Sequence, residues 1–94
     1  MPGERPKYVY WVHLLTGFGP DARPFSVIFE TPVATVAEIE ATLREHGIIA
    51  GCRLRAVDDG RGAKMIQRRE EFMIGIAGLI SLQPYQRPIW EPEE

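Results

Sequence analysis

The side chains of this chain with types suited to acid–base or nucleophilic chemistry are His13, His46, Cys52, Asp58 and Asp59. A hydrolase needs a nucleophile, a base and an orienting group in contact. Cys52 falls on the inward face of a predicted strand, where a free cysteine usually acts as a small buried residue. His46 falls at the end of a predicted helix, where an imidazolium complements the helix dipole. The sequence therefore predicts a protein that is not an enzyme and has no catalytic residues.

Metal and cofactor sites are not expected either. A zinc site needs three or four Cys or His ligands at close spacing, and this chain has one Cys and two His that are far apart in sequence. Asp58 and Asp59 lack the spacing of a calcium loop and fit an Asp- and Gly-rich turn better. The glycines before Lys64 lack the Gly-Lys-Ser/Thr ending of a phosphate-binding loop. We expect no metal and no cofactor.

A run of cations over 53–69 is the first candidate binding surface, which we call the arginine hairpin. Its proposed partner-binding residues are Arg53, Arg55, Arg61, Lys64 and Arg68. A guanidinium forms paired hydrogen bonds with carboxylates and phosphates alike. An acidic protein and a nucleic acid are therefore both possible partners, and a hydrated outer sheet face is the plainer alternative.

Aromatic side chains give the second candidate surface. Trp11 and His13 alternate on one face of a predicted strand, and Phe18 lies in a loop without an obvious local partner. Tyr85 and Trp90 lie in the proline-rich C-terminal segment. A large aromatic side chain is costly to leave in water. We expect Trp90 to pack on its own domain, and docking on another chain is the alternative.

The elements that would position these residues are strands and one helix. The strands are predicted over 7–15, 25–30, 51–57 and 63–69, from their β-branched and aromatic residues. The first strand is apolar on both faces, so it is central or one face meets a partner. The helix is predicted from a capping box, in which Thr35 caps and Glu38 lies three residues later. Gly47 ends it by taking the left-handed conformation.

The last third of the chain is harder to assign. Residues 72–82 are nearly all apolar, and both a helix and a buried strand fit them. The strand is preferred, because Gly75 and Gly78 weaken a helix more than a strand that can bulge. The predicted fold is an α+β domain over 1–94 in the order β-β-α-β-β-β. It has an antiparallel sheet of four to five strands, one helix packed on one face, a loose N-terminus over 1–6 and an extended tail over 84–94.

The composition of the chain argues against several classes of function. The net charge of −2 argues against a general nucleic-acid coat or a polybasic membrane binder. The apolar run over 8–15 is too short to span a bilayer and is not followed by a signal-peptide cleavage pattern. One cysteine forms no internal disulfide, so a cytoplasmic location without membrane contact is expected.

The functional prediction is a non-catalytic protein-interaction module, such as a bacterial or phage accessory protein, that binds another protein. A homodimer is also expected, since one helix covers only one face of the sheet. The first alternative is a nucleic-acid-binding protein that uses the arginine hairpin, and nucleic acid is ranked below protein as a partner. The second is a small enzyme or small-molecule binder that uses the loop over 16–24.

Overall fold

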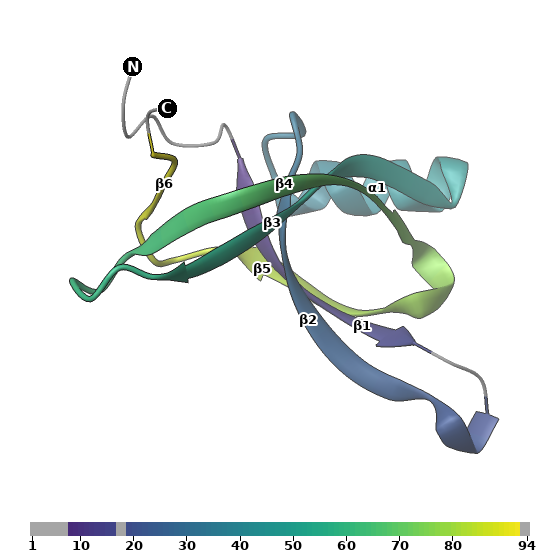
Figure 1. Cartoon of the computed structure of the whole chain (residues 1–94). Coiled ribbons are helices and arrows are strands. Elements are labelled where there is room, and N and C mark those ends of the chain that lie inside the picture. The colour runs from purple at the N-terminus through teal and green to yellow at the C-terminus, as the bar shows by residue number, and fades with distance from the viewer. Residues whose placement is uncertain (1–7, 17–18, 93–94) are drawn as a thin grey trace.

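The computed structural model describes residues 8–16 and 19–92, and in that part of the chain one helix lies beside one six-stranded sheet (Figure 1). The elements are β1 (Val9–Thr16), β2 (Arg23–Glu30), α1 (Val36–His46), β3 (Ile48–Asp58), β4 (Lys64–Gly75), β5 (Leu79–Pro84) and β6 (Ile89–Trp90). The strand order is β5-β1-β2-β3-β4-β6, and all neighbours are antiparallel except β4 and β6. The small α+β fold is confirmed, whereas the predicted count of four to five strands is wrong.

The first strand is central, as its two apolar faces predict. β1 pairs with β2 on one side and with β5 on the other. Tyr10, Val12 and Leu14 are buried on the face that the helix covers. Trp11 and His13 alternate with them and are half-buried on the opposite face.

The helix begins and ends as its sequence predicts. The Thr35 hydroxyl accepts a hydrogen bond from the Glu38 amide at 3.1 Å. Gly47 has a φ of 80°, and its amide donates to the Leu43 carbonyl at 2.8 Å. Ile39 and Leu43 are buried against the sheet, so the apolar stripe fixes which face of the helix packs.

Each face of the sheet has its own apolar cluster. The first cluster lies under α1 and consists of Tyr10, Val12, Leu14, Val27, Phe29, Ile39, Leu43, Ile49 and Ile74. The second lies on the opposite face and consists of Ile28, Leu54, Ile66 and Ile89, with Val9, Trp11, Ala56 and Tyr85 packed against it. A single helix covers only the first.

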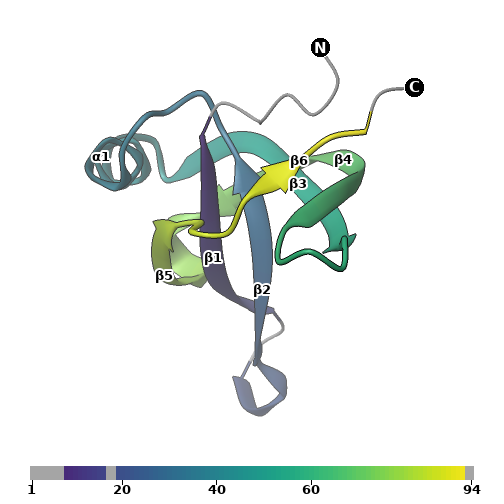
Figure 2. The same cartoon turned by 90° about the vertical axis from the view of Figure 1, so that its left-hand side faces the viewer.

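The second cluster is covered by the C-terminal part of the chain itself. β5 and β6 lie at opposite ends of the strand order, so residues 85–88 must cross the sheet, as Figure 2 shows. The Tyr85 amide donates to the Val9 carbonyl at 3.0 Å, and the Lys64 amide donates to the Pro88 carbonyl at 2.9 Å. Ile89 is 1% exposed. We call residues 85–90 the strap.

The strap changes two expectations. The segment over 84–94 is not a separate extended tail, because Pro84 ends β5 and Ile89–Trp90 forms β6. The uncovered second face, from which a homodimer was predicted, is covered from within the chain. The oligomeric state itself stays a prediction. The expected loose N-terminus over 1–6 lies outside the described residues.

Two predicted segments have different boundaries. Residues 72–82 are not one strand, because β4 ends at Gly75, a 3-10 turn spans Ile76–Gly78, and β5 follows. A uniformly apolar run does not encode where the chain leaves one strand for another. The predicted loop over 16–24 is shorter than expected, since β1 includes Thr16 and β2 begins at Arg23.

The backbone of β3 at Gly51 lies very close to Phe29 and Glu30 of β2. A Cβ built on Gly51 would lie 2.6 Å from Cζ of Phe29 and closer still to the Glu30 carbonyl oxygen. Phe29 is fully buried, and its ring lies 6.4 Å from that of Phe72, which pairs with Gly51 across β3 and β4. The aromatic ring therefore occupies the space that any side chain at position 51 would need.

We expect Gly51→Ala to destabilise the fold by about 1–3 kcal/mol, as overpacking of a filled core does. The melting temperature should fall by several degrees for each kcal/mol in a domain of this size. Gly75→Ala is the matched control, because its Cβ would meet nothing nearer than the Gly47 carbonyl oxygen at 4.0 Å. Equal melting temperatures for the two variants in calorimetry would contradict the prediction.

Candidate binding groove

A groove of about 650 Å³ lies where β2 and β3 separate. These strands pair only through Ile28–Leu54, Phe29–Arg53 and Glu30–Cys52. Beyond Ile28, β2 stays with β1, whereas β3 continues with β4 in a long hairpin that points elsewhere (Figure 1). The strap closes the groove on the side of β1.

The lining combines aromatic, amide and cationic side chains. It consists of Trp11, Ser26, Val27, Ile28, Arg53, Leu54, Arg55, Ala56, Val57, Lys64, Gln67, Gln83, Pro84, Tyr85, Gln86 and Arg87. Four of these are cations, three are glutamines and none is an aspartate or glutamate. A lining of this kind, in a chain whose net charge is −2, favours an anionic occupant.

Two aromatic rings lie in the middle of the groove. The ring centroids of Trp11 and Tyr85 are 5.9 Å apart, with an angle of 44° between the planes. His13 meets Trp11 edge-on at 5.6 Å. Trp11, Ile28 and Leu54 are in register across β1, β2 and β3, so the sheet fixes the indole beside the second apolar cluster.

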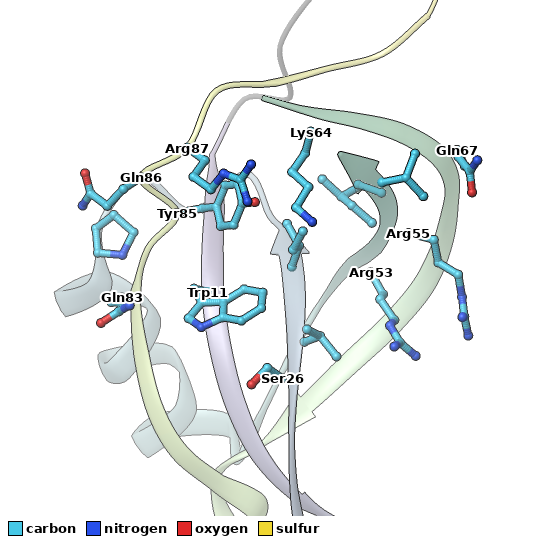
Figure 3. A pocket seen from close by; sticks show the side chains of 16 residues that line it. Trp11, Ser26, Arg53, Arg55, Lys64, Gln67, Gln83, Tyr85, Gln86 and Arg87 are labelled. Atoms are coloured by element: carbon cyan, nitrogen blue, oxygen red, sulfur yellow. The ribbon is translucent and has the colours of Figure 1, made fainter. Parts of the chain in front are cut away.

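Two of the lining cations form a pair, in which Arg87 comes from the strap and Lys64 from β4. In Figure 3, Lys64 and Arg87 lie beyond Tyr85, on the opposite side of its ring from Trp11. Both contact Oδ1 of Asp58, Lys64 through Nζ at 3.3 Å and Arg87 through Nη2 at 3.0 Å. The hydrogen bond from Lys64, followed by that from Arg87, lowers the pKa of Asp58. These two cations are therefore partly neutralised.

The cations of β3 differ from each other. Arg55 donates from Nε to Oε1 of Glu70 at 3.0 Å, and this bond lowers the pKa of the Glu70 carboxyl. Arg68 contacts the other oxygen of Glu70 at 3.4 Å. Arg53 forms no ion pair with any carboxylate in the described ranges 8–16 and 19–92. Arg53 is half-buried and lies opposite Glu70 across β3 and β4, where its charge helps to lower the pKa of that carboxyl without a direct ion pair. Arg53 is therefore the lining cation with the most capacity left for a ligand.

A charged network holds the strap in place behind the groove. Arg69 binds both carboxylate oxygens of Glu30, at 2.7 and 3.1 Å, and also contacts Oε2 of Glu91 at 2.6 Å. The hydrogen bonds that Arg69 donates to Glu30 and then to Glu91 raise its pKa. Trp90 donates from its indole nitrogen to Oδ2 of Asp59 at 2.9 Å. Trp90 thus packs on its own domain.

The groove brings together half of the residues that the sequence suggested for two separate surfaces. The groove lining includes five of the proposed residues, namely Trp11, Arg53, Arg55, Lys64 and Tyr85. Arg61, Arg68 and Trp90 do not line it, and His13 lies beside it against Trp11. Phe18 lies outside the described residues. None of the described residues over 16–24 lines the groove.

Sequence reasoning missed the polar contribution of the C-terminal segment. Arg87 was an isolated cation in a proline-rich stretch, and Gln83 and Gln86 carried no motif. Residues 83–87 show no regular alternation of apolar and polar side chains, so the sequence does not indicate which face of the sheet the segment crosses. Cys52, expected to be buried, is partly exposed and does not line the groove.

The groove has one contact of a catalytic type. Ser26 Oγ lies 2.7 Å from Nδ1 of His13, and these residues are cross-strand partners. Nucleophilic catalysis would also need a group that orients the imidazole, and no carboxylate bonds to His13 in the described part of the chain. No group of three metal-ligating side chains occurs there either. The arrangement is suited to binding.

No family model, curated protein or solved structure matches this chain. Among the described residues, no helix is long and apolar enough to cross a membrane. The chemistry of the groove is therefore what suggests a function.

The turn that anchors Trp90 should make stability depend on pH. Hydrogen bonds from Trp90, then Arg61, lower the pKa of Asp59 below its ordinary value of 3.8. A lowered folded pKa stabilises the protein above about pH 4, and that stabilisation is lost as pH falls through the folded pKa. Asp59→Asn should therefore lower the melting temperature at pH 7, and the difference from wild type should shrink as the pH is lowered below about 4.

The matched control is Asp21→Asn, a substitution at an exposed aspartate that should change the melting temperature little at any pH. Thermal unfolding followed by circular dichroism measures both variants. A difference between wild type and Asp59→Asn that is equally large at pH 7 and pH 2 would show that the carboxylate charge is not involved.

Proposed function

We propose that the protein is a non-catalytic interaction module whose groove binds an extended acidic segment of another protein. The observation that supports this is a lining with four cations, three amides and two aromatic rings but no carboxylate. Aromatic rings bind the apolar side chains of an extended peptide. Amide side chains donate to and accept from a peptide backbone, and arginine binds carboxylates in pairs of hydrogen bonds.

The charge balance favours a peptide over a nucleic acid. Lys64 and Arg87 share Asp58, and Arg55 is paired with Glu70. Arg53 is then the lining cation with the greatest spare capacity. A nucleic-acid strand is bound through many phosphate contacts along its backbone, whereas one guanidinium without a direct ion pair matches a single carboxylate side chain.

Nucleic acid remains the second candidate because of one observation. Trp11 and Tyr85 lie beside cations, and aromatic rings next to positive charge also stack the bases of single strands. The same experiment can separate the two candidates. It compares three probes of similar length. The first is a decapeptide of alternating Val and Glu, the second is a decapeptide of alternating Val and Lys, and the third is a ten-nucleotide oligo-dT.

We expect the Val–Glu decapeptide to bind and to move the indole resonance of Trp11 in NMR titrations of ¹⁵N-labelled protein. The indole of Trp90 is an internal control, because its hydrogen bond to Asp59 holds it away from the groove. Arg53→Gln should weaken binding about tenfold, the loss expected for a hydrogen bond to a charged group. Arg44→Gln, a substitution on the exposed side of α1, should leave binding unchanged.

Each outcome separates the candidates. Binding of oligo-dT but not of the Val–Glu peptide would replace the proposal with nucleic-acid binding. Binding of the Val–Lys peptide would show that the cations do not select the ligand. If no probe moves the Trp11 indole, the proposal is wrong.

A further inference from the structure

We infer that the acidic peptide binds as an added β-strand along the free edge of β2, in the gap between β2 and β3. This inference rests on the proposed function and specifies how the groove is filled. The whole of β2 pairs with β1, but only residues 28–30 pair with β3. In the described part of the chain, residues 23–27 of β2 have no strand on their other side. Their backbone groups on that side face the gap.

The groove passes through this gap and does not lie on one face of the sheet. Trp11, Ile28 and Leu54 are in register on one face, whereas Arg53 is in register with Phe29 and so points to the opposite face. Trp11 and Arg53 nevertheless line the same groove. A groove bordered by side chains from both faces of a sheet has the shape left by a missing strand.

An added strand would contact both the aromatic lining on one face of the sheet and the cationic lining on the other face. Successive side chains of a strand point to opposite faces, so alternate residues would meet Trp11 and the intervening ones would meet Arg53. Apolar residues suit the positions that meet Trp11, and acidic residues suit the positions that meet Arg53. The backbone of the peptide would pair with the edge of β2, as in other cases of strand addition.

The free outer edge of β4 is protected against such pairing, whereas the edge of β2 is not. Beyond Met65, the edge of β4 that faces away from β3 has no strand partner among the described residues, but this edge carries four consecutive charged residues over 68–71. A register shift at Arg55–Ala56 distorts the same hairpin. Charges and bulges are common ways to prevent edge pairing. Residues 25–27 of β2 are uncharged, and Pro24, which has no amide hydrogen, marks the end of the usable edge.

Backbone pairing can be tested with peptides that lack amide hydrogens on one edge. In an extended strand the amides of alternate residues point to the same side. One Val–Glu decapeptide is therefore N-methylated on every Val and a second on every Glu, which leaves their side chains unchanged. At least one of the two should bind about tenfold more weakly than the unmodified decapeptide, or not at all.

A second readout is hydrogen exchange of the protein. With the unmodified decapeptide at saturation, the amides within 25–27 that point away from β1 should exchange about tenfold more slowly. The amides of α1 are the control and should keep their exchange rates.

The outcomes distinguish this inference from the proposed function. If both methylated peptides bind as well as the unmodified one, or if the amides within 25–27 gain no protection, strand addition is wrong while the acidic-peptide groove stands. If the unmodified decapeptide does not move the Trp11 indole, the proposed function itself fails. Weaker binding of a methylated peptide together with protection of β2 supports the inference.

Discussion

The fold depends on the contact between the Phe29 ring and the bare backbone of Gly51. Because Gly51 has no side chain, β3 can approach β2 closely next to the point where Cys52 pairs with Glu30. Ile49 lies in the helix-covered cluster, and Leu54, five residues later, lies in the opposite one. The close packing at Gly51 holds one end of the short β2–β3 pairing, and the groove opens beyond its other end, at Ile28 and Leu54.

The strap links stability to binding. It covers the second apolar cluster with Ile89 and provides one wall of the groove with Tyr85 and Arg87. Its anchors are the Arg69 network and the turn that holds Trp90. These anchors are charged hydrogen bonds at partly exposed positions, which contribute less per contact than buried apolar groups. Residues behind the groove can thus alter its wall without touching a ligand.

Local signals in the sequence predicted local structure correctly. The Thr35 cap, the Gly47 terminus and the alternation in the first strand depend on neighbours within a few residues, and all are found in the structure. The candidate site needed information of longer range. Trp11, Arg53 and Tyr85 were each selected, but as members of two surfaces. Their convergence follows from β5 pairing with β1, and nothing in residues 72–82 marks the turn that makes this pairing possible.

That pairing also determines how the chain must fold. The β3–β4 hairpin joins partners as near in sequence as Asp58 and Lys64, whereas β1 meets β5 through residues as distant as Tyr10 and Pro84. Closing so long a loop costs entropy before any contact compensates for it. Chains dominated by distant contacts fold in roughly milliseconds to seconds, and those with local contacts fold faster. The hairpin is thus suited to form early, and the groove, which needs both ends of the described chain, can be completed only in the last stage of folding.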